Sequence, residues 1–348
     1  MIFTIFGYPK TGKTTLFNLL TGQREHVDKF ASSKGELHKA VVSVPDPRLE
    51  ELNKFYNTKI KHAQIEYLDT GSLAFGEVKT ATFLDILRRS DGLIHVVRGF
   101  EDPEIVHPAG SIDPMRDISS MEDELIISDI ITIEKRLERI EKDLKRNKSK
   151  ELESEHKVLI KIKEFLEQNL PLREMDLARD EDFMIRGFQF LSQKPIIHMI
   201  NLSEGDELVE SDGKNKKILS FYGKIEEEIM DLDEDERKLF LKEYGIDESI
   251  RDRFIRESYK LMNLISFFTV GEDEVRAWTI RKGDTAYEAA GKIHTDLQKG
   301  FIRAEVIYWE DFVKVGGFKN AKEKALLRLE GKDYIVKDGD IVHIRFNV

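Results

Sequence analysis

The feature that most constrains the fold lies close to the N-terminus, in the segment Gly7-Tyr8-Pro9-Lys10-Thr11-Gly12-Lys13-Thr14. This segment satisfies the G-x-x-x-x-G-K-[ST] pattern of a phosphate-binding loop. The apolar run at residues 2–6 precedes it as a strand would, and residues 14–20 resemble a helix. Strand, loop and helix form the context in which this pattern binds a nucleotide, so the sequence predicts an α/β nucleotide-binding domain.

The chemistry of such a loop assigns a role to four of its residues. Gly7 and Gly12 let consecutive backbone N–H groups converge on phosphate oxygens. Lys13 would reach the β- and γ-phosphates, and the Thr14 hydroxyl would ligate Mg²⁺. We therefore predict that ATP or GTP binds here with Mg²⁺. The other loop residues expected to contact the nucleotide are Tyr8, Pro9, Lys10, Thr11 and Thr15.

Two polar segments that follow apolar runs point to the same site. Asp69 ends the run at residues 65–68 and is predicted to bind Mg²⁺ through water, although alone it would also fit a surface turn. Asn201-Leu202-Ser203-Glu204 stands where GTPases carry their base-reading Asn-Lys-x-Asp motif. Because Glu204 is longer than Asp and Leu202 replaces lysine, we expect weaker selectivity for guanine, which makes adenine a plausible base.

Composition limits the setting of the protein. The 348 residues include no cysteine, which excludes disulfides and thiolate metal sites. A net charge of −11 argues against broad coating of nucleic acid, so DNA is not an expected partner. No apolar run reaches the roughly 18 residues that cross a bilayer, and the N-terminus lacks a signal-peptide core. We expect a cytoplasmic protein that does not contact a membrane.

The apolar pattern changes along the chain. Up to about residue 118, apolar runs alternate with helix-like stretches, as in a mainly parallel sheet covered by helices. Two charged stretches with helical spacing, separated by a polar break at residues 147–150, predict an antiparallel helical hairpin. Sheet character returns at residues 195–200. After about residue 266, strands at 275–280, 304–308, 334–336 and 341–346 and a helix at 285–297 predict a small α+β module.

These changes give the expected domain bounds. The nucleotide-binding domain takes residues 1–118 and 191–265, the helical insertion takes 119–190, and the last module takes 266–348.

Several further segments are distinctive. In the first part these are Val44-Pro45-Asp46-Pro47-Arg48-Leu49, His95-Val96-Val97-Arg98-Gly99-Phe100-Glu101-Asp102 and Asn201-Leu202-Ser203-Glu204. Near the C-terminus they are Val275-Arg276-Ala277-Trp278-Thr279-Ile280, Ala290-Gly291-Lys292-Ile293-His294-Thr295-Asp296 and the segment from Glu330 to Asp340. Together they resemble the YchF family, the Obg-like ATPases, over nearly the whole chain, and the C-terminal segments are similar to the TGS domain of that family.

The resemblance implies a P-loop NTPase G domain with an inserted helical arm, followed by a ubiquitin-like TGS domain. It also implies that ATP is favoured over GTP and that the protein associates with the ribosome or ribosomal RNA. In this family an apolar residue, here Leu73, takes the place of the usual catalytic glutamine, and a loop histidine is thought to replace it. His107 matches that histidine and is the candidate catalytic group that orients water.

Departures from the family pattern gather around the γ-phosphate position. Lys10 stands where the family has an asparagine linked to a potassium ion, whose charge an ammonium group would replace. Lys34 stands where a Mg²⁺-ligating threonine is expected, and in Asp69-Thr70-Gly71-Ser72 the glycine comes one place early. The stretch between residues 204 and 218 is short and polar, so a peripheral helix of the G domain is expected to be lost.

Three functions stay open on the sequence. The leading one is an ATP-preferring hydrolase; the second is a nucleotide-binding scaffold on the ribosome with little or no turnover. The third is an RNA-binding adaptor whose TGS module and helical arm do the work. Candidate phosphate contacts for the adaptor, which also fit a solvated surface, are Lys292, Lys299, Arg303, Lys319, Lys322 and Lys324.

Overall fold

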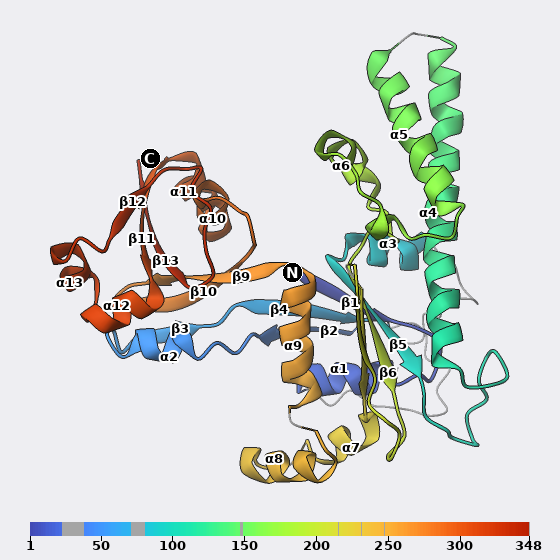
Figure 1. Cartoon of the computed structure of the whole chain (residues 1–348), viewed down its shortest axis with the longest axis horizontal. Coiled ribbons are helices and arrows are strands. Elements are labelled where there is room, and N and C mark those ends of the chain that lie inside the picture. The colour runs from blue at the N-terminus through green and yellow to red at the C-terminus, as the bar shows by residue number, and fades with distance from the viewer. Residues whose placement is uncertain are drawn as a thin grey trace. The chain divides into compact units, whose positions relative to one another are not determined.

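The computed structural model describes residues 1–22, 38–70, 81–146, 149–214, 216–230, 232–246 and 248–347 (Figure 1). The contacts within the chain divide it into two compact units. The first comprises Met1–Ala40 and Glu66–Phe254, and the second comprises Val41–Ile65 and Ile255–Val348. The sequence places residues 41–65 inside the nucleotide-binding domain, whereas their contacts place them in the C-terminal unit.

A mainly parallel sheet forms the centre of the first unit. Its strand order is β2-β4-β1-β5-β6-β8-β7. Strands β4, β1, β5, β6 and β8 run parallel to one another, and the short β7 lies antiparallel to β8 at one edge. The strands span Ile2–Phe6 (β1), His38–Ser43 (β2), Gln64–Asp69 (β4), Gly92–Arg98 (β5), Ile196–Asn201 (β6), Glu210–Gly213 (β7) and Lys216–Phe221 (β8). The predicted α/β fold is therefore confirmed.

Helices cover both faces of this sheet because side chains alternate between the faces along a strand. On one face, Phe6 packs with residues of α3 (Ala81–Arg89) and α4 (Pro114–Leu144). On the other, Phe3 meets the ring of Phe254 from α9 (Ile250–Leu261). The remaining helices of this unit are α1 (Lys13–Thr21), α6 (Arg179–Ile185), α7 (Gly223–Glu228) and α8 (Glu234–Glu243), with 3-10 turns at Leu172–Glu174 and Arg186–Phe188.

The helical arm consists of α4 and α5 (Lys150–Leu166), which lie side by side in Figure 1. Asp113 caps the N-terminus of α4 by accepting from the backbone N–H of Arg116, and Pro114 occupies the first turn. Buried apolar side chains of both helices, including Ile133 and Leu159, form the arm core. The hairpin is as predicted, although α4 begins at Pro114, earlier than the expected boundary at residue 119.

The second unit is an α+β domain built on a six-stranded mixed sheet. The strand order is β12-β11-β13-β9-β10-β3. The strands span Lys59–Lys61 (β3), Leu264–Val270 (β9), Glu274–Arg281 (β10), Phe301–Tyr308 (β11), Arg328–Glu330 (β12) and Asp340–Phe346 (β13). The helices are α2 (Arg48–Asn53), α10 (Ala286–Ile293), α11 (Thr295–Lys299), α12 (Trp309–Val315) and α13 (Phe318–Glu323). Alanines of α10 pack against the sheet and form its main core.

Two local predictions for this unit are wrong. Residues 334–336 form no strand, because only an isolated bridge joins Ile335 to Thr285. The predicted helix at residues 285–297 is interrupted at His294, whose extended backbone (φ −163°, ψ 144°) separates α10 from α11. The side chain of His294 then caps the second helix by accepting from the N–H of Asp296.

Between residues 204 and 218, the described part of the chain contains β7 and no helix, in line with the expected loss of a peripheral helix. None of the helices in the described ranges is long and apolar enough to cross a membrane.

Candidate functional site: a phosphate loop at the end of β1

The predicted phosphate loop connects β1 to α1, so its backbone turns at the carboxyl edge of the parallel sheet. Both loop glycines are needed there. Gly7 has φ 145°, and a Cβ on it would lie 2.4 Å from the Val96 carbonyl oxygen. Gly12 has φ 97°, and a Cβ on it would lie 2.3 Å from Nδ2 of Asn201. A side chain at either position would collide with its neighbours and strain the backbone.

Lys13 folds back across this loop. Its Nζ donates to the carbonyl oxygens of Gly7 at 3.2 Å and Tyr8 at 2.8 Å. Burial lowers the pKa of Lys13 to about 8, while the charge of Asp69 acts in the opposite direction. In the described part of the chain, the hydrogen-bond partners of this buried ammonium group are carbonyl oxygens. An anion would compensate its charge better, which suits a phosphate site.

Thr14 and Asp69, the two residues predicted to serve Mg²⁺, lie in contact. The Thr14 hydroxyl, in the first turn of α1, donates to Oδ2 of Asp69 at 3.1 Å. Asp69 ends β4, the strand beside β1, and its side chain is buried. A hydroxyl and a carboxylate side by side supply the hard oxygen ligands that Mg²⁺ prefers.

Asn201 links the phosphate loop to the segment that follows β8. Its Nδ2 donates to the carbonyl oxygen of Thr11 at 3.2 Å, and its Oδ1 accepts from the N–H of Gly223 at 3.1 Å. A Cβ at Gly223 would lie 2.7 Å from Oδ1. Asn201 therefore holds the phosphate loop from behind, a role that its motif alone did not reveal.

The other predicted contacts are more open. Leu202 is half-buried beside Gly99, whereas Glu204 is exposed at the end of the motif. Lys10 is exposed and has a positive φ of 60°, which is uncommon for a residue with a side chain. Tyr8 and Pro9 are half-buried, while Thr11 and Thr15 are buried.

His107 lies next to the loop and is buried. Its Nδ1 accepts from the N–H of Ala109 at 3.1 Å, so the proton of the neutral ring sits on Nε2. Nε2 lies 2.9 Å from Oδ2 of Asp117, a residue of α4. The imidazole ring also stands edge-on to the ring of Tyr8, at 6.3 Å between centroids. The structure thus brings this histidine to the phosphate loop from a segment about 100 residues away.

The expectations for Lys34, Gly71, Ser72 and Leu73 concern residues outside the described ranges.

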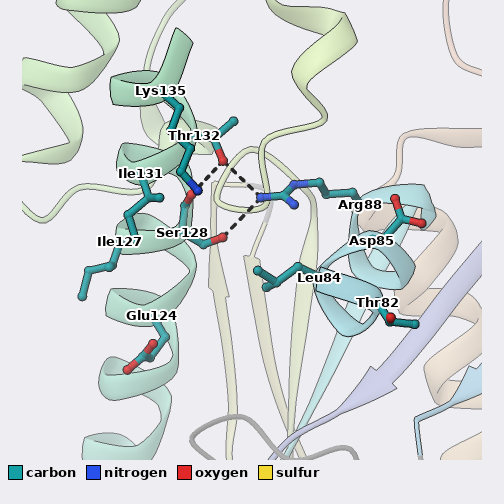
Figure 2. A pocket seen from close by; sticks show the side chains of 10 residues that line it. All are labelled: Thr82, Leu84, Asp85, Arg88, Glu124, Ile127, Ser128, Ile131, Thr132 and Lys135. Carbon is teal, nitrogen blue, oxygen red and sulfur yellow. Dashed lines mark hydrogen bonds between the residues drawn. The ribbon is translucent and has the colours of Figure 1, made fainter. Parts of the chain in front are cut away.

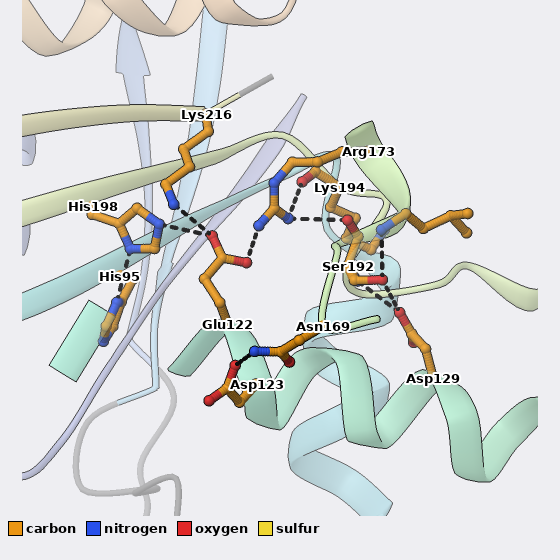
Figure 3. Close-up of polar contacts among 11 residues, drawn as sticks. His95, Glu122, Asp123, Asp129, Asn169, Arg173, Ser192, Lys194, His198 and Lys216 are labelled. Carbon is orange, nitrogen blue, oxygen red and sulfur yellow. Dashed lines mark hydrogen bonds and ion pairs between the residues drawn. The ribbon is translucent and has the colours of Figure 1, made fainter. Parts of the chain in front are cut away.

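A buried polar network beside the loop was missed by the sequence reasoning (Figure 3). It contains His95, Glu122, Arg173 and His198. The available signal was the presence of a histidine inside each of two apolar strand segments, residues 93–97 and 195–200.

A separate hollow of about 700 Å³ lies between α3 and α4 (Figure 2). Arg88 donates there to the hydroxyls of Ser128 and Thr132, and the partly exposed Ile127 and Ile131 complete the α4 side. None of its lining residues belongs to the phosphate loop. The nucleotide site is therefore assigned from the loop geometry and not from the size of a cavity.

A parallel sheet whose first strand leads through this loop into a helix, with Lys13, Thr14 and Asp69 converging on it, defines a P-loop NTPase domain. Residues 2–201 match the family model MMR_HSR1, "50S ribosome-binding GTPase", and residues 264–347 match YchF-GTPase_C, "Protein of unknown function (DUF933)". The chain belongs to the YchF family.

Full-length relatives support this assignment. "Ribosome-binding ATPase YchF" of Bacillus subtilis is 38% identical, over 99% of this chain and 98% of the relative. The protein of that name from Escherichia coli O157:H7 is 39% identical with the same coverage. "Obg-like ATPase 1" of Caenorhabditis elegans is 34% identical, over 99% and 91%. The structure of the Schizosaccharomyces pombe YchF GTPase matches 99% of this chain and 97% of that one, with 30% identity and a TM-score of 0.81.

Proposed function

We propose that this protein binds and hydrolyses ATP, and GTP less well, in association with the ribosome. The observation that carries the proposal is the convergence of Lys13, Thr14 and Asp69 at a loop whose two glycines leave no room for side chains. The relatives named as ribosome-binding ATPases supply the ribosome, and the cytoplasm is the corresponding location.

The residues of the loop divide the work of binding. Lys13 would exchange its carbonyl partners for phosphate oxygens, because an anion compensates its buried charge better. Thr14 and Asp69 would hold Mg²⁺, which neutralises phosphate charge when it is bound. Because burial lowers the pKa of Lys13 to about 8, nucleotide affinity is expected to fall as the pH rises above about 8.

Selection of the base is assigned to Asn201, Leu202 and Glu204. Asn201 is already engaged by Thr11 and Gly223, so its main contribution is to fix the loop. Leu202 offers an apolar surface for a purine, and the exposed Glu204 is free to accept from an amino group. Adenine presents such a group at N6 and guanine presents one at N2, so this contact alone does not select the base. The preference for ATP is inferred instead from Glu204 and Leu202, which stand in place of the Asp and Lys that GTPases use to read guanine.

His107 is the proposed water-positioning residue. Its proton on Nε2, its burial and its position beside Tyr8 suit a group that orients water near a phosphate. Oδ2 of Asp117 lies 2.9 Å from Nε2, although the two atoms are not aligned for a hydrogen bond, so hydrolysis requires the histidine to turn away from this carboxylate. The same pairing favours the second candidate function, a nucleotide-binding scaffold with little turnover.

The test compares nucleotide binding and turnover in wild type, Lys13→Ala and His107→Ala with Mg²⁺ present. Binding is measured by calorimetry with ATP and with GTP, and turnover by phosphate release. We expect Lys13→Ala to lose binding by at least about 100-fold, as the loss of a charged phosphate contact predicts. His107→Ala should bind ATP normally but hydrolyse it about 100-fold more slowly.

Normal binding with no turnover in the wild type would replace the hydrolase with the scaffold. No binding of either nucleotide would remove both. Association with the ribosome is tested by co-sedimentation of the full chain with ribosomes, with and without ATP, and recovery of the protein only in the supernatant would contradict that part of the proposal.

A further inference from the structure

A buried carboxylate on the arm helix organises the polar network beside the phosphate loop (Figure 3). Glu122 of α4 accepts from Arg173 through one oxygen, and its other oxygen lies 3.1 Å from Nε2 of His198 and 3.6 Å from Nζ of Lys216. Burial alone would raise the pKa of Glu122, but the His198 hydrogen bond and the neighbouring positive charges outweigh it and bring this pKa to about 2. Glu122 is therefore ionised and can only accept hydrogen bonds.

The ionised Glu122 fixes the protons on two histidines. Nε2 of His198 must carry a proton to donate to it. Burial lowers the pKa of His198, so the ring is neutral near pH 7 and its Nδ1 is an acceptor. Among the described residues, Nδ1 of His95, 3.0 Å away, is the donor for that nitrogen. The chain of hydrogen bonds thus runs from His95 through His198 to Glu122.

The His95 ring at the end of this chain lies under the phosphate loop. His95 is fully buried in β5, in register with Phe6, and the two rings are 5.3 Å apart. A Cβ placed on Gly7, the first loop glycine, would lie 3.4 Å from Cδ2 of His95. The imidazole ring therefore lies close to the first glycine of the loop.

The same helix reaches the next loop residue through a second histidine. Asp117, also buried on α4, lies 2.9 Å from Nε2 of His107, and the His107 ring stands against Tyr8. Asp117 in the first turn of the arm helix and Glu122 in the third thus each lie beside a histidine, and the rings of His107 and His95 lie near the consecutive loop residues Tyr8 and Gly7. Simple core packing would be served by apolar side chains, without the desolvation cost of buried charges.

We propose that Glu122, His198 and His95 are positioning residues, which hold the phosphate loop in its binding conformation and connect it to the helical arm. The inference rests on the proposed nucleotide binding. It adds that a change in the conformation of the arm would alter the affinity of the phosphate loop for nucleotide. The coupling is reciprocal, so nucleotide binding must also affect the base of the arm.

The first test measures affinity for a fluorescent ATP analogue in full-length His198→Phe, which keeps an aromatic ring and removes both hydrogen bonds. We expect affinity to fall about tenfold. In metal sites, removing a residue that hydrogen-bonds to a ligand costs about 10- to 100-fold, and the value expected here is the lower end of that range. The matched control is Asp129→Asn. Asp129 is fully buried on the same helix, and it accepts from Leu191 and Ser192 in the segment before β6.

The control variant should bind within about twofold of wild type, even where both variants are less stable in urea. An unchanged affinity in His198→Phe, or equal losses in the two variants, would overturn the proposal.

The second test needs no nucleotide, and it remains decisive if the His198→Phe variant does not fold. Nitrogen-15 NMR of the full chain labelled at histidine should find the proton of His198 on Nε2 and that of His95 on Nδ1. In Glu122→Gln, the amide oxygen must face Arg173, so its NH₂ group faces His198 and the tautomers of both rings should reverse. His95→Phe identifies the His95 signals among those of nine histidines.

Opposite tautomers in the wild type, or tautomers unaffected by Glu122→Gln, would contradict the hydrogen-bond chain even if ATP binds. Conversely, correct tautomers in a protein that binds neither ATP nor GTP would remove the proposed function and leave the network as part of the core.

Discussion

At the scale of single residues, the nucleotide site is determined by contacts that tolerate no extra atoms. Gly12 is the clearest example, because its backbone is left-handed and its missing Cβ is the space that Asn201 occupies. We predict that Gly12→Ala weakens ATP binding by about 10- to 100-fold, from the combined cost of backbone strain and collision. Calorimetry with Mg²⁺-ATP measures the effect.

A second variant separates the two causes. Asn201→Ala removes the collision and keeps the strain, although it also removes a contact that fixes the loop. Gly12→Ala should therefore cost less ATP affinity when it is added to Asn201→Ala than when it is added to wild type. Equal losses in the two backgrounds would show that the collision contributes nothing.

Also at this scale, Glu226 gives stability a definite pH dependence. Burial raises its pKa from 4.5 to about 7, and its side chain accepts from the N–H of Ile250. The folded protein therefore holds a proton that the unfolded chain releases between about pH 4.5 and 7. Because the folded state binds more protons, this group makes stability fall as pH rises through that window.

Glu226→Gln keeps the hydrogen-bond acceptor without the charge. We expect it to be more stable than wild type by about 1–3 kcal/mol at pH 8 and nearly equal at pH 4.5, in urea unfolding. The control is the exposed Glu228 of the same helix, whose change to Gln should leave the stability profile within about 0.5 kcal/mol at both pH values. A constant difference between Glu226→Gln and wild type across the pH range would contradict the assignment.

At the scale of elements, the arm is a hairpin with its own core. Leu159 of α5 is fully buried there with Ile133 and Ile140, whereas its neighbour Ile160 is partly exposed. Leu159→Ala should cost about 2–5 kcal/mol, because it leaves a cavity between the helices. Hydrogen exchange should show faster exchange in α4 and α5 and little change in the strands that carry the phosphate loop.

Ile160→Ala is the control on the same helix and should leave exchange in the arm nearly unchanged. Equal changes of hydrogen exchange in Leu159→Ala and Ile160→Ala would contradict the assignment of Leu159 to the arm core.

At the scale of the whole molecule, residues 41–65 belong to the C-terminal unit, although the chain on either side of them belongs to the nucleotide-binding unit. β3 pairs in parallel with β10, and Arg48 binds Asp46 and Asp338 while its guanidinium lies over the Phe268 ring. The C-terminal unit is therefore built from two pieces of chain, and residues 264–347 alone lack one strand of its sheet.

We predict that Arg48→Ala destabilises the C-terminal unit by about 1–3 kcal/mol, because it leaves the buried Asp46 without its partner. Both tryptophans, Trp278 and Trp309, lie in this unit, so the midpoint of the tryptophan fluorescence transition should move to lower urea. Lys54→Ala, which breaks an exposed ion pair in the same segment, should not move it. A transition that is identical in Arg48→Ala and wild type would contradict the two-piece unit.

The sequence by itself determined the class of the protein, because the relevant signals are local. The phosphate loop needs only glycines, a lysine and a threonine at fixed spacing, and the change from strand to helix pattern is visible within a few residues. It also predicted Mg²⁺ roles for Thr14 and Asp69, and the structure places these two side chains in contact.

Only the tertiary structure decided which distant groups support that loop. His95 and His198 are 103 residues apart, and His198 and Glu122 are 76 apart, so neither contact leaves a periodic trace in the sequence. Likewise, the contacts of Asn201 with Thr11 and Gly223 join residues 190 and 22 positions away from it, and its motif did not reveal them. Local patterns specify elements and loops, but the partners of a buried polar group follow from how strands and helices far apart in the chain pack together.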